Sequence, residues 1–149
     1  LVGEMRDLET IGLAMTAVET GHLVFATLHT SGAARSVNRI VDVFPPSQQA
    51  QIRTVFSEAV TAVISQLLFK RRVGRGRVAA VEVMVGIPAT RNLIREGKGS
   101  QITAAMQTSR QLGMQTMDFS LVELYKENLV DKEIILPYLS SPEAIGSLM

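Results

Sequence analysis

The amino-acid sequence predicts an α/β fold with a mostly parallel sheet, followed by an α-helical C-terminal subdomain. Strand-like apolar runs alternate with helical repeats over residues 1–87, and this order favours right-handed crossovers between parallel strands. From Pro88 onward only helical patterns remain. We therefore expect residues 1–87 to carry the sheet and residues 88–149 to form the helical subdomain.

The first elements alternate as this fold requires. Residues 1–3 are typical of the end of a buried strand, and Asp7 can cap a helix in which apolar residues recur at helical spacing. Residues 23–28 (Leu-Val-Phe-Ala-Thr-Leu) are nearly all apolar, which predicts a strand buried on both faces of a parallel sheet. A second helix is expected from about Gly32 to Val43, ended by two prolines.

A long helix and a basic turn are expected next. Ser47 can cap a helix whose apolar stripe continues to Leu67. The turn from Lys70 to Arg77 then joins this helix to a strand over Val78 to Val85. This turn holds five of the fifteen positive charges, but no aromatic residue interleaves with them, which argues against binding to single-stranded nucleic acid. A solvated turn or a salt-bridged subunit contact fits it better.

Composition excludes several classes of protein. The sequence has no cysteine, so disulfide scaffolds, thiol catalysis and cysteine-ligated zinc are ruled out. No apolar run approaches the roughly 18–20 residues that a membrane span needs. The net charge of +1 argues against a bulk polyanion binder. The sequence also lacks a GxxxxGK[ST] phosphate loop.

Two polar side chains follow predicted strands directly, Glu4 after the first and His29 after the second. Ligands of parallel sheets bind beyond the carboxyl ends of the strands, so both side chains are expected at one edge. There a carboxylate could polarise a water or hold hydrated Mg²⁺, and an imidazole could donate to a phosphate. The alternative is that Glu4 pairs only with Arg6 while His29 caps the following helix.

His22 has a different position. His22 comes just before the second strand, seven positions before His29. Seven residues of a regular strand span about 23 Å, and an odd offset places the two side chains on opposite faces. A metal site shared by the two histidines is therefore not expected. His22 is interpreted as a structural hydrogen-bonding residue beneath the sheet or as an interface contact.

Five segments together resemble one family. LVGEMRDLET (residues 1–10) resembles the Walker B segment of secretion-type ATPases, and TGHLVFATLHT (20–30) resembles their histidine box. FPPSQQ (44–49), ATRNLIRE (89–96) and LGMQTMD (112–118) further resemble the type IV pilus retraction ATPases, the PilT family. The resemblance covers essentially the whole chain.

Two observations favour retraction ATPases over their assembly and type II secretion relatives. Those relatives usually carry a four-cysteine zinc module, whereas this chain has no cysteine, and ATRNLIRE is the hallmark of the retraction family. The departures are small. Thr90 stands where the family usually has Ile, and Ala26 stands where Gly is common.

The resemblance implies a RecA-like P-loop NTPase core, truncated so that it starts at the Walker B strand, with ATP and Mg²⁺ as ligands. By its match to the family, Glu4 is implied as the catalytic glutamate, acting on the attacking water and on Mg²⁺ through water. His29 matches the histidine that senses the γ-phosphate, and His22 matches the other histidine of that box, with a weaker link to the nucleotide.

The ATRNLIRE segment is implied as a retraction signature. It comprises Ala89, Thr90, Arg91, Asn92, Leu93, Ile94, Arg95 and Glu96. The polar face of this segment matches family residues that are needed for retraction and have no obvious part in hydrolysis. The alternative is an ordinary helix in which Leu93 and Ile94 pack inward while the charged residues face water.

The resemblance also implies a homohexameric cytoplasmic motor at the cytoplasmic face of the inner membrane, peripheral to it. Such a motor powers type IV pilus retraction and twitching motility by ATP hydrolysis, with inner-membrane pilus-base proteins as partners and no nucleic acid. The family's PAS-like domain, arginine fingers, phosphate loop and Asp box precede the Walker B strand and are missing here, so this chain alone is expected to be inactive. The alternative is a non-catalytic interaction module that docks on the pilus-base proteins.

Overall fold

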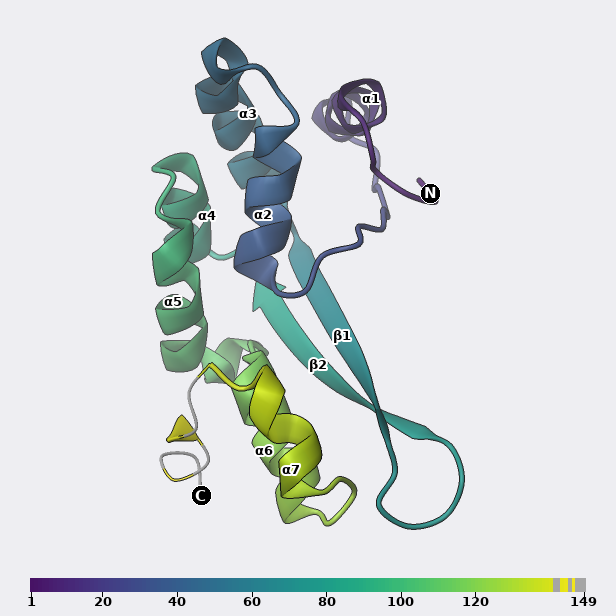
Figure 1. Cartoon of the computed structure of the whole chain (residues 1–149). Helices are drawn as coiled ribbons and strands as arrows, with labels where there is room; N and C mark the ends of the chain where they lie inside the picture. The colour runs from purple at the N-terminus through teal and green to yellow at the C-terminus, as the bar shows by residue number, and fades with distance from the viewer. Residues whose placement is uncertain (141–142, 145, 147–149) are drawn as a thin grey trace.

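A computed structural model describes residues 1–140, 143–144 and 146 of the chain. Its central feature is a long antiparallel β-hairpin, with helices along one side and a wide loop at the free end (Figure 1). The elements follow in the order α1 Leu8–Glu19, α2 Ala33–Asp42, α3 Pro46–Ala59, β1 Ala62–Lys70, β2 Arg77–Val85, α4 Pro88–Arg95, α5 Ile102–Thr108, α6 Met117–Lys126 and α7 Lys132–Ile135. Short 3₁₀ turns lie at 99–101, 110–112 and 136–138.

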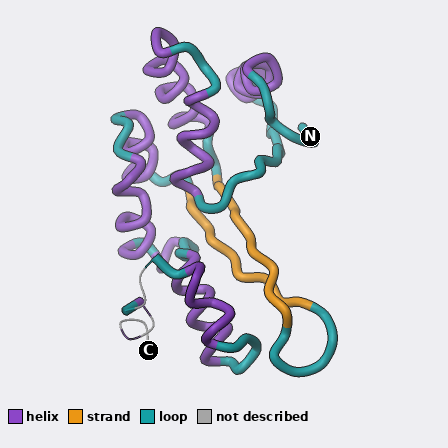
Figure 2. The backbone as a smooth tube through the Cα atoms, viewed as in Figure 1, coloured by secondary structure: helices purple, strands orange, loops and turns teal. Residues whose placement is uncertain are grey.

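The N-terminal segment pairs in parallel with the segment after α1. Val2 and Ala26 form a parallel bridge, and the Met5 amide donates to the Thr27 carbonyl over 3.0 Å. The parallel relation of the two predicted strands is therefore confirmed, but the pairing is short and both segments are loops elsewhere (Figure 2). The longer pair, β1 with β2, is antiparallel, unlike the mostly parallel sheet that the strand–helix alternation predicts.

The apolar segment 23–28 is not buried on both faces in this chain. Leu23 is 74 % exposed and Phe25 is 64 % exposed. The prediction of a doubly covered strand is wrong here because, among the described residues, the backbone bonds of this segment reach only Val2 and Met5, so nothing holds it inside a wider sheet.

The first two predicted helices are confirmed. The Asp7 carboxylate accepts from the Thr10 amide at 2.8 Å and caps α1, because side-chain oxygens satisfy the free amides of a first helical turn. The apolar repeat of α1 places Ile11 and Met15 in the core, while Leu8 stays 42 % exposed. Helix α2 falls within the predicted range and begins after Gly32, whose φ is +97°.

The helix predicted to reach Leu67 ends at Ala59 instead. Val60 is already extended, and β1 runs beside β2 from Ala62 opposite Val85 to Lys70 opposite Arg77. The helical reading of residues 62–67 was wrong because these residues gain a full ladder of hydrogen bonds from β2, and tertiary pairing outweighs local periodicity. The basic turn is therefore a hairpin loop between two strands rather than a turn between a helix and a strand.

Two hydrophobic clusters hold the helices to the hairpin. The larger one packs helices α1 to α5 against Met84 of β2, and it includes Ile11, Val37, Ile40, Phe56, Ile94, Ile102 and Met106. The smaller one packs α6 and α7 against Phe69 and Ala80. Phe69 meets Tyr138 edge to face, with ring centroids 5.1 Å apart.

The described residues after Pro88 form helices and turns, as predicted, apart from a single bridge between Val83 and Gln115. The predicted helical subdomain runs to residue 149, and its residues 141–142, 145 and 147–149 lie outside the described part of the chain. None of the described helices has the length and apolar character required to cross a bilayer.

Candidate functional site

Glu4 and His29 are brought together by the parallel pairing of their segments. The hydroxyl of Thr27 donates to the Gly3 carbonyl, which fixes the two segments just before these residues. His29 Nε2 then lies 2.9 Å from Glu4 Oε1. Arg6 Nε lies 2.5 Å from the same oxygen. The shared edge and the Glu4–Arg6 pair are thus both present, whereas His29 does not cap α2, because its N-cap is Gly32.

The surroundings of Glu4 keep its carboxyl group ionised. The hydrogen bond from Arg6 is the largest influence and lowers the pKa of Glu4, partial desolvation opposes it, and the charges of Arg6 and His29 lower this pKa further. An ionised carboxylate orients water well, but a lowered pKa makes it a weak proton acceptor. The pair therefore suits the positioning of a water or a hydrated cation.

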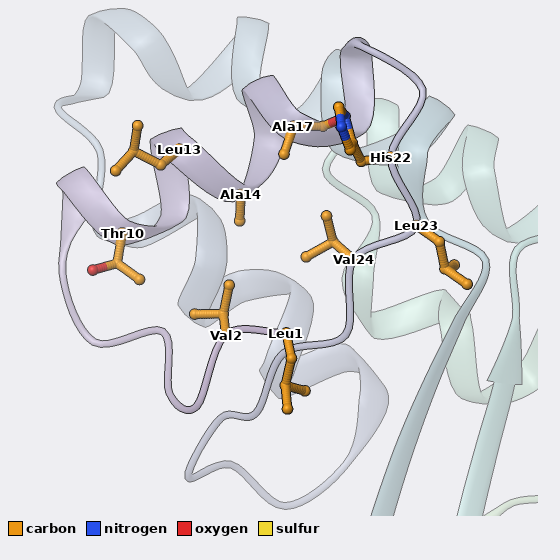
Figure 3. Close-up of a pocket in the computed structure, with 9 residues that line it drawn as sticks. All are labelled: Leu1, Val2, Thr10, Leu13, Ala14, Ala17, His22, Leu23 and Val24. Atoms are coloured by element: carbon orange, nitrogen blue, oxygen red, sulfur yellow. The ribbon is translucent and has the colours of Figure 1, made fainter.

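His22 lies apart from this pair. Its Nδ1 is 3.1 Å from the Thr20 hydroxyl and 3.2 Å from the Ala17 carbonyl, at the end of α1. The ring faces an apolar cavity of about 360 Å³ between α1 and the exposed segment (Figure 3). The apolar side chains that line this cavity include Leu1, Val2, Leu13, Leu23 and Val24. The structure gives His22 the hydrogen-bonding position that its place before the strand suggests.

Within the described residues, no three His, Cys, Asp or Glu side chains gather closely enough to hold a metal ion. Glu4 is the one carboxylate beside His29, and its side chain is 23 % exposed. A single, partly exposed carboxylate fits a contact with Mg²⁺ through water, since this ion keeps several waters and takes its remaining ligands from phosphates.

The ATRNLIRE segment forms α4 and the turn after it. Ile94 is fully buried and Leu93 packs against the core, as the alternative reading of this helix requires. Thr90 is also fully buried, and its hydroxyl accepts from the Ile87 amide at 3.1 Å and donates to the Val85 carbonyl at 2.8 Å. The threonine at this position therefore secures the start of α4 in a way that isoleucine would not.

The residues of this segment that do not pack into the core differ in their exposure. Ala89, Asn92, Arg95 and Glu96 are exposed. Arg95 approaches the Asn92 side chain at 3.4 Å, and Glu96 pairs with Lys98 at 2.7 Å. Exposed pairs of this kind add little stability.

Arg91 is half-buried and contacts the backbone of neighbouring elements, unlike the reading in which the charged residues of α4 simply face water. Its guanidinium donates to the carbonyls of Ser57, Glu58 and Val60 at the end of α3, and also to that of Gly86. A cation at a helix C-terminus satisfies free carbonyls and complements the helix dipole. A Cβ on Gly86 would meet the Val60 carbonyl oxygen at 2.1 Å, so glycine is required for this approach.

Sequence reasoning missed Glu82 altogether. This residue lies on β2, is 8 % exposed, and contacts the starts of two helices. The available signal was an acidic residue inside an otherwise apolar strand, because such a charge is buried only where partners satisfy it.

The fold and the motif-bearing segments place the chain among the secretion system proteins. The chain belongs to the type II/IV secretion system protein family, whose model matches residues 1–129. A twitching motility protein of Neisseria gonorrhoeae is 59 % identical over 133 residues, which make up 89 % of this chain and 36 % of that protein. The type IV pilus retraction ATPase PilT of Pseudomonas aeruginosa is 57 % identical over 133 residues, 89 % of this chain and 38 % of that protein.

A solved structure gives the same result. The crystal structure of the pilus retraction motor PilT with bound ADP superimposes with a TM-score of 0.86 and 45 % identity, covering 98 % of this chain and 40 % of that one. The resemblance to the pilus retraction family is confirmed, as is the α/β secretion-ATPase fold. The chain spans between about a third and two fifths of the length of these relatives.

Proposed function

We propose that this chain is the C-terminal part of a hexameric ATPase motor that powers type IV pilus retraction and twitching motility. The observation that carries the proposal is the Glu4–His29 pair, which unites the Walker B-like and histidine-box-like segments at 2.9 Å. The similarity to a retraction ATPase over 89 % of the chain supports it. In this proposal the substrate is ATP with Mg²⁺.

Glu4 and His29 have complementary roles in this mechanism. Glu4 is ionised and would orient the attacking water, and it is the residue that would hold hydrated Mg²⁺. Bound Mg²⁺ would supply neutralisation of the phosphate charge. The His29 side chain is 80 % exposed, so it is free to turn from Glu4 toward a γ-phosphate oxygen and thereby report that phosphate. His22 supports the end of α1 and has at most an indirect role.

We also propose that residues 1–87 belong to the RecA-like core and residues 88–149 to the helical C-terminal subdomain. Ile94 and Ile102 share a hydrophobic cluster with Ile11 and Val37. The boundary after residue 87 therefore separates two functional regions that pack around the same hydrophobic cluster. The whole motor would act in the cytoplasm, peripheral to the inner membrane, and would engage inner-membrane pilus-base proteins.

This proposal is tested by a chimera in which the chain replaces the matching part of the P. aeruginosa retraction ATPase. We expect the chimera to restore twitching in a strain that lacks its own retraction motor, because the paired segments and the α4 surface are all supplied. A hexameric chimera that hydrolyses ATP yet leaves twitching absent would contradict the assignment to retraction.

The exposed surface of α4 favours a second role that is compatible with the first, namely docking on a pilus-base protein. Asn92 and Arg95 are exposed, and the side-chain contacts that they make among the described residues are long, 3.4 Å between the two and 3.9 Å from Arg95 to Glu58. The variant Arg95→Ala in the chimera separates the two roles. If α4 docks on a pilus-base protein, this variant should lose twitching while it retains ATP hydrolysis. Unchanged twitching would remove Arg95 from the docking surface.

The 149-residue chain alone is expected to bind ATP and Mg²⁺ very weakly or not at all. Phosphoryl transfer needs a backbone cradle and a lysine on the β- and γ-phosphates, and this sequence has no phosphate-loop motif. Isothermal calorimetry with the chain in the cell measures this directly. Micromolar affinity would show that the residues present form a sufficient site.

A further inference from the structure

Glu82 is a buried carboxylate that bridges the starts of two helices. Its Oε1 accepts from the Ala33 amide at 2.6 Å, and its Oε2 accepts from the Met117 amide at 3.1 Å. Ala33 and Met117 are the first residues of α2 and α6. The free amides and the positive dipole ends of both helices therefore compensate the buried negative charge.

The α2 end of this bridge adjoins the candidate site. Only three residues separate His29 from Ala33, and the first helical turn is fixed on both strands of the hairpin. Ser65, directly opposite Glu82 in the ladder, accepts from the Gly32 amide at 3.1 Å. A Cβ on Gly32 would lie 3.4 Å from Glu82 Oε1 on a backbone with φ of +97°, so glycine suits this approach to the carboxylate.

The α6 end is fixed on the same strand. Gln115 bridges Val83, and the Ser120 hydroxyl accepts from the Val81 amide at 2.9 Å. Thr116 caps α6 by accepting from the Phe119 amide at 3.3 Å. The first turn of α6 therefore packs against β2 next to Glu82, on the buried face of the hairpin.

We propose that Glu82 is a positioning residue that links the loop carrying His29 to the first turn of α6. One carboxylate serves both helix starts, so a displacement of either helix changes the bond that the other receives. This inference goes beyond the proposed function, since the link concerns the fold of the chain with or without a nucleotide.

The test is Glu82→Gln in this chain, followed by amide hydrogen exchange and by the ring resonances of His29 and His22. Glutamine offers one acceptor oxygen, and its NH₂ group would face the remaining amide. We expect amide exchange at Ala33 or Met117 to accelerate at least tenfold. The ring resonances of His29 should shift, and those of His22 should stay unchanged. The matched control is Glu123→Gln, which removes a half-exposed carboxylate of α6 that pairs with Lys126 and not with a helix start.

Coupling is tested by a double-mutant cycle with Thr116→Ala, which loosens the start of α6. This variant should shift the His29 resonances when Glu82 is present and leave them unmoved in the Glu82→Gln background. Thr116→Ala alone decides the question if Glu82→Gln does not fold. The proposal is overturned if Thr116→Ala leaves His29 unmoved with Glu82 intact, or if Ala33 and Met117 keep their protection in Glu82→Gln. It is likewise overturned if exchange accelerates equally over the whole hairpin, which indicates a purely global loss of stability.

Because every measurement is made without nucleotide, failure here leaves the proposed ATPase function untouched. Conversely, loss of the ATPase assignment would leave the structural link testable.

Discussion

Replacing Glu4 by glutamine in the chimera is expected to abolish ATP turnover while nucleotide binding remains. Glutamine keeps the size of the side chain and an oxygen within reach of Arg6 and His29, but it removes the negative charge that orients the attacking water. Loss of the group that positions the reacting water is expected to lower turnover by about 100-fold or more. The measurement is the initial rate at saturating ATP, beside direct binding of a fluorescent nucleotide.

The control for this prediction is Glu19→Gln, an exposed glutamate at the end of α1. It removes the same charge at a distance from the Glu4–His29 pair, so turnover should stay near that of the unmodified chimera. Hydrolysis by Glu4→Gln at an undiminished rate would refute the role of Glu4. Loss of both turnover and nucleotide binding would instead indicate that the carboxylate mainly supports the structure of the site.

Arg6 adds a condition to the role of Glu4. Its hydrogen bond is the main reason that the pKa of Glu4 is lowered, so the carboxylate accepts a proton poorly while this bond is present. Glu4 in this state can hold and orient a water but not readily deprotonate it. A role as general base would require that Arg6 first move away, whereas a role in holding water requires no such change.

The candidate site could be predicted because its cause is local. Glu4 and His29 each follow an apolar segment directly, and parallel pairing of Val2 with Ala26 is enough to bring the two side chains to one edge. The burial of those segments could not be predicted in the same way. The apolar run 23–28 indicates which residues suit a covered strand, but the covering side chains have to come from other elements.

The strand β1 was missed for a related reason. Its Val63 and Leu67 continue the helical spacing of the preceding residues, and the choice of a strand depends on β2, which follows only after the hairpin loop. Glu82 is equally hidden in the sequence, because its partners Ala33 and Met117 are 49 and 35 residues away. Periodicity reports the face of an element, whereas these features depend on contacts between distant parts of the chain.

Arg91→Ala is expected to destabilise the chain strongly. The guanidinium satisfies carbonyls at the end of α3 and that of Gly86, and the side chain is half-buried. Leaving such acceptors without a donor costs about 1–3 kcal/mol, and charge-assisted bonds lie at the upper end of that range. We therefore expect a loss of about 2–3 kcal/mol, which corresponds to a decrease in Tm of about 4–12 °C for a chain of this size.

Two variants make this prediction specific. Arg91→Lys should recover only part of the stability, because an ammonium group cannot reproduce the planar set of donors that reaches both α3 and Gly86. Arg95→Ala, in the same segment, should change stability by less than about 0.5 kcal/mol, since its contact with Glu58 is 3.9 Å long and exposed. Thermal unfolding followed by circular dichroism compares the three variants with the native chain. Equal effects of Arg91→Ala and Arg95→Ala would contradict this division.

If the division holds, the two arginines of ATRNLIRE act differently, Arg91 by joining α4 to α3 and Arg95 at the exposed surface. Loss of twitching in an Arg91 variant would then report a weakened fold rather than a lost contact with a partner.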